Sequence, residues 1–232
     1  MEAEEYGVLK NALAAKKDPG EVAIAFTKPT REAFVPGQTE QPQLEEHFSR
    51  SWKSVIEIAI DTPHEKQEPL VDILRAIQQQ NVADSEEASE IEIWGDKVKV
   101  WKDMPLFGAQ AREIWNRAPG TNSNNDLSAS QWQNINAFLA RLTALSSSIP
   151  AFDFSLYAIW TLRSAFENEE SKEVDRRAGE MWFLYAGEVI ERLSREGKVF
   201  DGKIAREGGE FEGKGWRGFN RERLEVWKEG VR

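Results

Sequence analysis

Apolar residues recur at helical spacing along most of this chain, and this spacing limits the folds that are open to it. The clearest example is the segment 129–146, where Trp132, Ile135, Leu139 and Leu142 fall three or four residues apart. Stripes of the same kind predict further helices at about 5–16, 43–60, 62–77, 105–117, 153–168, 172–195 and 220–231. Because strands do not alternate with helices, a doubly wound sheet is not expected. The sequence therefore predicts a mainly α fold, a single-domain bundle of seven or eight helices.

Two of these helices carry capping signals at their starts. Ser128 and Gln131 form a capping box ahead of the helix at 129–146. Thr62 and Glu65 have the same spacing, and the proline between them suits the first position of a helix. These signals predict that the second helix begins directly after Thr62, which places His64 in its first turn. At the other end of a helix, Gly197 is expected to cap the segment 172–195.

One segment, at about 90–101, changes from helical spacing to strict alternation of apolar and polar residues. This period of two, around a Gly95-Asp96 dipeptide, predicts a small β-hairpin. The expected cross-strand pairs are Ile93 with Val98, Ile91 with Val100 and Glu92 with Lys99. A lone hairpin is only marginally stable in water, so we expect its Ile and Val side chains to rest on helices.

Prolines and glycines suggest how the chain is divided. Pro19, Pro29, Pro36 and Pro42 follow the first short helix, so residues 1–42 are expected to be that helix and an extended arm. Residues 43–232 are then a single helical domain. Within it the glycine-rich segment 200–218 should be irregular and should lead into a C-terminal helix. The glycines should let Trp216, Phe219 and Trp227 fold back onto the domain.

Composition excludes several classes of function. The chain has no cysteine and two histidines, so we expect no disulfide, no metal site and no cofactor. A net charge of −10 argues against binding to nucleic acid. The N-terminus is acidic, and no apolar run approaches the roughly 20 residues that span a bilayer. A cytoplasmic protein without membrane contact is the expectation.

Tryptophan is the residue type in excess, with nine spread over the chain. Several arginines stand beside these tryptophans on apolar stripes, where a charge needs a carboxylate, an aromatic ring or a bound anion. Arg163, for example, lies four residues before Glu167 and could pair with it. Either internal Arg–Glu pairs tie the helices together, or an aromatic pocket holds arginines as anchors for an acidic or polar small molecule. The candidate binding residues are Arg112, Trp115, Trp132, Arg141, Trp160, Arg163, Trp182, Tyr185 and His64.

The order of several motifs resembles an uncharacterised fungal protein family over residues 60–232. The residues that carry the resemblance are Trp101, Met104-Pro105-Leu106-Phe107-Gly108, Arg112-Glu113, Trp115, the run from Trp132 to Leu142, Tyr157-Ala158-Ile159-Trp160, Arg163, Glu167 and the tail from Gly218 to Lys228. Met104 and Leu224 depart mildly from the family pattern, which has leucine and tryptophan there. The resemblance implies a fungal source and a mostly helical fold, and it brings no activity and no catalytic residues.

Three functions stay open at this point. The leading hypothesis is a non-enzymatic binding or interaction domain whose groove is lined by Trp and Arg side chains from residues 105–190, with a small molecule or a protein as partner. The second is a small-molecule enzyme without a cofactor. In that case His64, Tyr185, Glu188 or Glu167 would supply protons, and Arg112, Arg141 or Arg163 would bind an anion. The third is a structural homo-oligomer with tryptophans at its interface.

Overall fold

The computed structural model describes residues 3–34, 41–80, 90–121 and 124–231. Over these residues it contains nine α-helices and one two-stranded antiparallel sheet, which confirms the predicted mainly α fold. Its contacts divide the chain into two compact units, residues 1–126 and 127–232, called here the N-terminal and C-terminal units. The expected boundary after residue 42 does not coincide with this division, because the helices before it pack on those that follow.

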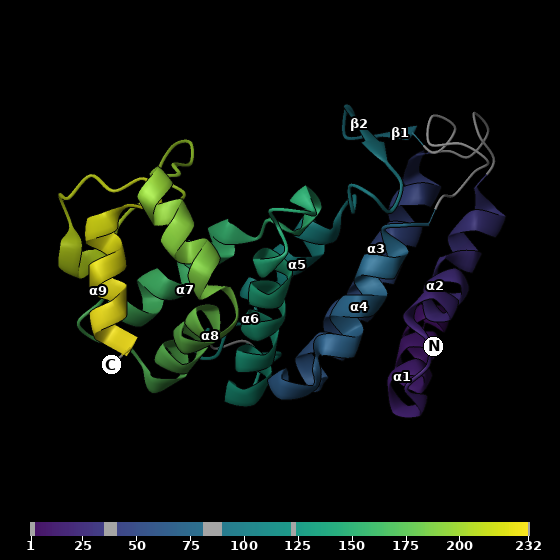
Figure 1. The fold of residues 1–232 in the computed structure, drawn as a ribbon, viewed down its shortest axis with the longest axis horizontal. Coiled ribbons are helices and arrows are strands. Elements are labelled where there is room, and N and C mark those ends of the chain that lie inside the picture. The colour runs from purple at the N-terminus through teal and green to yellow at the C-terminus, as the bar shows by residue number, and fades with distance from the viewer. Residues whose placement is uncertain (1–2, 35–40, 81–89, 122–123, 232) are drawn as a thin grey trace. The chain divides into compact units, whose positions relative to one another are not determined.

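The N-terminal unit contains five α-helices, one 3₁₀ turn and the hairpin in its described residues. They are α1 (Glu4–Ala15), α2 (Pro19–Ala33), α3 (Gln41–Asp61), the 3₁₀ turn η1 (His64–Lys66), α4 (Glu68–Ile77), β1 (Glu90–Ile93), β2 (Asp96–Lys99) and α5 (Phe107–Trp115). Helix α1 packs on α3, and α2 packs on α4 (Figure 1). Helix α5 packs on α3.

Helix α2 replaces most of the expected extended arm. The Asp18 carboxylate caps it by accepting hydrogen bonds from the backbone N–H groups of Gly20 and Glu21. Pro19 stands at the first helical position and Pro42 near the start of α3, where a missing N–H costs nothing. The prediction was wrong because it treated every proline between residues 18 and 42 as a helix breaker, whereas α2 also contains Pro29 in its interior. The remaining part of the arm, residues 35–40, lies outside the described residues.

The helix start predicted at Thr62 is also wrong. Its hydroxyl donates back to the carbonyl oxygen of Ile58 at 2.7 Å, which extends α3 instead of capping the next helix. His64 lies in the 3₁₀ turn η1, and α4 begins only at Glu68. The side chain of Gln67 joins the two helices, because its Nε2 donates to the carbonyl oxygen of Ala59 at 2.9 Å.

The hairpin forms where it was predicted, but its turn lies one residue earlier. Trp94 and Gly95 form the turn, with φ values of 54° and 87°. A two-residue type I′ turn needs left-handed backbone at both positions and favours glycine at the second. Ile91 therefore pairs with Val98, and Ile93 with Asp96. The shift by two residues leaves the apolar side chains on one face, so the alternating pattern could not distinguish the two registers.

An aromatic cluster forms the core of the N-terminal unit. Trp52 and Trp101 are fully buried and meet edge to face, with ring centroids 5.5 Å apart. Phe26, Phe48 and Phe107 contact one or both of them. Such edge-to-face contacts add to the free energy of burial. This cluster joins α2, α3, α5 and the loop that follows β2.

The C-terminal unit consists of four α-helices and two 3₁₀ turns in its described residues. They are α6 (Ala129–Ala144), the turn η2 (Pro150–Phe152), α7 (Ser155–Phe166), α8 (Glu173–Glu196), the turn η3 (Gly209–Phe211) and α9 (Arg221–Val231). Helix α8 packs on α6, α7 and α9. The predicted capping box of Ser128 and Gln131 and the C-terminal cap at Gly197 are confirmed.

A buried asparagine joins three helices of this unit. The Oδ1 atom of Asn136 on α6 accepts hydrogen bonds from Nε1 of Trp182 on α8 at 2.8 Å and from the hydroxyl of Thr161 on α7 at 2.7 Å. Its Nδ2 donates to the carbonyl oxygen of Trp132 at 2.9 Å. Because all these polar groups are buried and paired, the network fixes how the helices pack.

Candidate functional site

A pocket of about 920 Å³ lies in the C-terminal unit, between the end of α7 and the glycine-rich segment that leads to α9. Figure 1 shows this segment as the long loop between α8 and α9. Five glycines contribute to the pocket wall: Gly202, Gly208, Gly209, Gly213 and Gly215. The pocket has the size of a site for a small organic molecule.

Positive charge dominates the wall of this pocket. Four cationic side chains line it, namely Arg163, Lys203, Arg206 and Arg217, against the carboxylates of Glu207 and Glu212. Within the part of the chain that the structure describes, none of the four cations forms a salt bridge with a carboxylate. In a protein of net charge −10, this pocket is a local site of the opposite sign. Such a site attracts anions.

Arg163 is the cation that the fold holds most firmly. It lies half-buried near the end of α7, where its Nη1 donates to the carbonyl oxygen of Arg206 at 3.3 Å. Burial lowers the pKa of the Arg163 guanidinium, the positive charges of Arg223 and Arg206 lower it further, and Glu167 opposes them. A guanidinium in these surroundings is stabilised when an anion binds beside it.

The expected pair between Arg163 and Glu167 does not form, because Glu167 binds a different arginine. Arg223 on α9 and Glu167 are both fully buried, and Nε and Nη2 of Arg223 donate to the two carboxylate oxygens at 2.7 and 3.1 Å. Nε1 of Trp227 donates to Oε1 of Glu167 at 2.6 Å, and the N–H of Gly208 donates to Oε2 at 2.7 Å. Both carboxylate oxygens of Glu167 are thus occupied twice.

The same arginine holds the backbone of the glycine-rich segment in place. Its Nη1 donates to the carbonyl oxygens of Ala205 and Gly218 at 2.8 and 2.9 Å, and its Nη2 donates to that of Arg206 at 3.0 Å. All five N–H donors of Arg223 are therefore used. The buried ion pair fixes the loop that carries most of the pocket wall.

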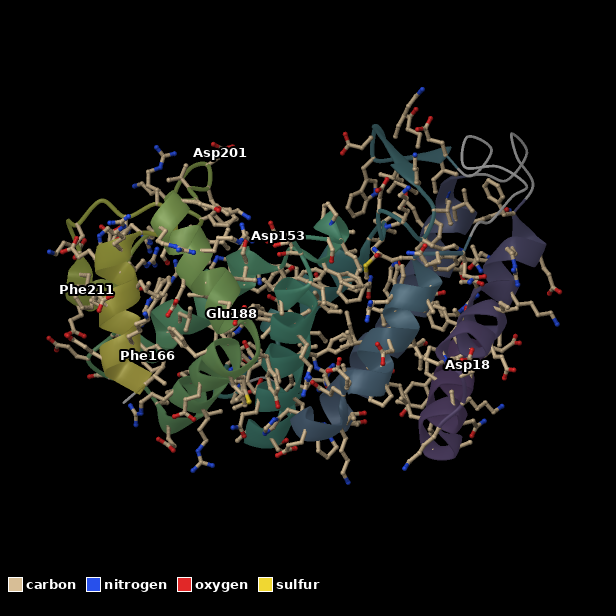
Figure 2. All side chains as sticks on the ribbon, in the orientation of Figure 1. Asp18, Asp153, Phe166, Glu188, Asp201 and Phe211 are labelled. Atoms are coloured by element: carbon tan, nitrogen blue, oxygen red, sulfur yellow. The ribbon has the colours of Figure 1, made fainter. Side chains whose placement is uncertain are left out.

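Aromatic packing closes the far end of this segment. Trp216, Phe219 and Trp227 are buried, as the sequence predicted. The ring of Trp216 stacks on Phe211, labelled in Figure 2, with centroids 5.2 Å apart. The guanidinium of Arg223 lies 5.5 Å from the ring centroid of Trp216, whose Nε1 donates to Oε2 of Glu222 at 3.3 Å. The tryptophan thus supports the loop next to the pocket.

The candidate residues of the C-terminal unit do not come together in one groove. Trp182 and Trp132 are buried core residues. Arg141 lies over the ring of Tyr185, with its Cζ 3.9 Å from the ring centroid. Of the predicted set, only Arg163 lines the pocket. Trp160 contacts the glycine-rich segment through a hydrogen bond, which its Nε1 donates to the carbonyl oxygen of Ile204 at 2.9 Å.

The other three candidates belong to the N-terminal unit. Arg112 is exposed on α5 and Trp115 is half-buried at the end of the same helix. His64 is mostly covered, and its Nε2 lies 3.1 Å from the carboxylate of the neighbouring Glu65.

The sequence did not identify most of the pocket residues. Lys203, Arg206 and Arg217 occur in a stretch of mixed charge that suggested an ordinary solvated surface. Their gathering depends on Arg223, which binds three carbonyl oxygens of the loop from a helix further along the chain. The one available signal was the density of glycine between residues 200 and 218, which indicated irregular backbone but gave no direction for its side chains.

Two further properties concern metals and membranes. Within residues 3–34, 41–80, 90–121 and 124–231, no group of three or more histidine or carboxylate side chains is placed to hold a metal ion. Over the same residues, none of the helices has the length and apolar character needed to cross a bilayer.

Comparison with known proteins places the chain in a family. Residues 52–231 match the family described as protein of unknown function (DUF3632). No curated protein and no solved structure matches the chain. The match spans well over half of the sequence and includes residues 127–231 of the C-terminal unit with its pocket, and it agrees with the resemblance drawn from the motifs between residues 60 and 232. The chain therefore belongs to the DUF3632 family, whose description assigns no function.

Proposed function

We propose that the C-terminal unit is a non-enzymatic binding module that holds a small anion in the pocket beside Arg163. The observation that carries this proposal is a half-buried guanidinium that has no carboxylate partner among the described residues and faces a pocket of about 920 Å³. Lys203, Arg206 and Arg217 add positive charge to the same wall. Phosphate and carboxylate groups are the anions that arginine binds with two parallel hydrogen bonds.

Three observations favour binding over catalysis. Glu167, one of the proton donors considered for an enzyme, has both oxygens engaged by Arg223, Trp227 and the backbone of Gly208. Tyr185 is covered by Arg141, and Glu188, labelled in Figure 2, is exposed on α8. Neither lines the pocket.

A cytoplasmic location, a fungal source, a protein partner and a homo-oligomeric form remain predictions from the sequence.

Binding is tested by isothermal titration of the full chain with citrate and with pyrophosphate at low ionic strength, where screening is weak. The wild-type protein is expected to bind at least one of them and to unfold at a higher temperature in its presence. Arg163→Gln should weaken binding at least tenfold, because a charge-assisted hydrogen bond contributes about 1.5–3 kcal/mol.

Arg195→Gln is the matched control, because Arg195 is an exposed arginine on α8 that does not line the pocket. It removes the same charge from the same unit and should leave the affinity nearly unchanged. Equal losses in both variants would show that the anion responds only to net charge, and the proposal would then fail. It would fail equally if neither anion bound to the wild-type protein.

A further inference from the structure

One carboxylate of the protein already occupies an anion-binding position in the pocket wall. This position, called here the seat, consists of the backbone N–H groups of Gly213 and Gly215. Oε1 of Glu207 accepts hydrogen bonds from the backbone N–H groups of Gly213 and Gly215, at 3.2 and 3.1 Å. Both glycines have left-handed backbone, with φ values of 91° and 71°. Because of this conformation their N–H groups point to the same oxygen, which is the arrangement of a backbone nest for anions.

The electrostatics of Glu207 agree with this geometry. Its own backbone N–H lowers the pKa of the Glu207 carboxyl group most, burial opposes the shift, and the N–H groups of Gly215 and Gly213 lower it further. The positive charge of Arg223 also contributes. The seat therefore stabilises a negative charge, and it does so inside a wall that carries four cationic side chains.

Both glycines and Glu207 line the pocket. A Cβ atom built on Gly213 or on Gly215 would meet no atom within 4 Å, so close packing does not confine this part of the loop. Glycine is required there by the left-handed backbone alone. By contrast, a Cβ on Gly208 would lie 2.4 Å from the carbonyl oxygen of Glu167, so that part of the loop is fixed by close packing. Because Glu207 and the two glycines line the same pocket, a bound anionic group would lie next to the Gly213 and Gly215 N–H groups that Glu207 now occupies.

We propose that Glu207 is an internal substitute for the ligand: its carboxylate fills the Gly213–Gly215 seat in the empty pocket, and an anionic group of the bound molecule replaces it. This inference rests on the proposed function, namely that the pocket binds an anion. The ligand class is then a small molecule with at least one carboxylate or phosphate group for the seat and negative charge for Arg163. Glu207 competes with that ligand for the N–H groups of Gly213 and Gly215. The wild-type protein therefore binds the ligand more weakly than it would if these two groups were unoccupied.

The competition is tested by titrating Glu207→Ala and Glu207→Gln with citrate and with pyrophosphate, alongside the wild-type protein. The alanine variant leaves the seat empty and should bind about tenfold more tightly or better, because the ligand no longer displaces a charged hydrogen-bond acceptor. The glutamine variant keeps a neutral oxygen near the seat and should fall between alanine and wild type. In ¹H–¹⁵N spectra, the amide signals of Gly213 and Gly215 should shift in Glu207→Ala and should shift again when either anion is added.

Glu212→Ala is the matched control, because Glu212 is an exposed carboxylate that lines the same pocket and makes no hydrogen bond to the loop backbone among the described residues. It should tighten binding by no more than about threefold, the effect expected of one screened surface charge. If Glu212→Ala tightens binding as much as Glu207→Ala does, the role of Glu207 is refuted. It is also refuted if the amide signals of Gly213 and Gly215 do not shift when the anion is added. Neither result contradicts the proposal that the pocket beside Arg163 binds an anion. Loss of binding in the wild-type protein and in every variant would refute both. If the alanine variant does not fold, the glutamine variant alone decides. The tighter of the two anions identifies the seat as one for carboxylate or for phosphate.

Discussion

The two units of the protein build their cores from different chemistry. In the N-terminal unit, Trp52 and Trp101 pack edge to face with three phenylalanines, and this aromatic cluster forms the centre of the core. In the C-terminal unit, the buried pair of Glu167 and Arg223 lies among aromatic rings and binds backbone groups of a long loop. Apolar packing holds side chains together, whereas the ion pair also fixes a stretch of backbone without regular structure. This difference explains why the described pocket with the cationic wall is built in the C-terminal unit.

The strongest way to break this comparison is to remove the charge of Glu167. Glu167→Gln leaves Arg223 buried without a counter-charge, so the C-terminal unit should lose about 3–5 kcal/mol of its free energy of unfolding. Urea denaturation measures the loss, and hydrogen exchange of peptides from α7 and α9 locates it. Glu173→Gln removes a carboxylate from the exposed pair with Arg177, 2.8 Å long, and should cost far less, because solvent screens a fully exposed pair. Similar losses for the two variants would mean that the buried Glu167–Arg223 pair contributes no more to the free energy of unfolding than an exposed pair does.

A second test concerns the close packing around Phe166, which Figure 2 labels beside α9. A Cβ atom added to Gly179 on α8 would lie 2.7 Å from Cε2 of Phe166, and one added to Gly230 on α9 would lie 2.5 Å from its Cδ1. Gly179→Ala should therefore destabilise the unit by about 1–3 kcal/mol through overpacking. Gly187→Ala on the same helix meets no atom within 4 Å and should be neutral or stabilising by up to about 1 kcal/mol. Thermal unfolding of the two variants decides, and a Gly179→Ala protein as stable as wild type would show that Phe166 moves aside.

The aromatic cluster of the N-terminal unit permits a finer test. Nε1 of Trp52 donates to the carbonyl oxygen of Pro105 at 2.7 Å, whereas Nε1 of Trp101 is buried without a hydrogen-bond partner in the described part of the chain. Phenylalanine at position 52 leaves a buried carbonyl unpaired, and at position 101 it removes an unpaired donor. Trp52→Phe should thus cost about 1 kcal/mol more than Trp101→Phe in urea denaturation. The opposite order would show that ring volume, and not hydrogen bonding, decides the cost.

The comparison of the units also shows how far the sequence could lead. Helices with local signals were predicted well: the Ser128–Gln131 capping box and the cap at Gly197 involve residues within a few positions of each other. Helix α2 was missed for two reasons. Pro19 was judged without regard to its position at the start of the helix, where proline is favourable, and Pro29 lies in the helix interior, where proline is normally unfavourable.

The candidate site depends on contacts that no local pattern reveals. Glu167 and Arg223 lie 56 positions apart, so sequence spacing suggested that Glu167 pairs with the nearer Arg163 instead. Arg163 was still identified, because an arginine on an apolar stripe requires a partner of some kind. Glu167, the partner expected for Arg163 from the sequence, pairs with Arg223 instead, and Arg163 lines the pocket.

The smallest expected effect lies at the contact of α1 with α3. Oε1 and Oε2 of the buried Glu5 accept hydrogen bonds from the guanidinium of Arg50, which also lies 2.8 Å from Nδ1 of His47. Burial lowers the pKa of His47 below its ordinary value of 6.5, and the charge of Arg50 lowers it further. Glu5 and Glu46 oppose both effects.

Because the pKa of His47 is lower in the folded protein, the unfolded chain binds more protons below pH 6.5. The contribution of His47 to stability is complete above pH 6.5 and is lost as the pH falls through the lowered pKa. The imidazole is partly exposed to solvent, so screening keeps this loss well below about 1 kcal/mol. His47→Gln cannot be protonated, and its free energy of unfolding should fall less than that of the wild type between pH 7.5 and pH 5.5. Equal pH slopes in urea denaturation would mean that the contact of His47 with Arg50 does not distinguish the two protonation states.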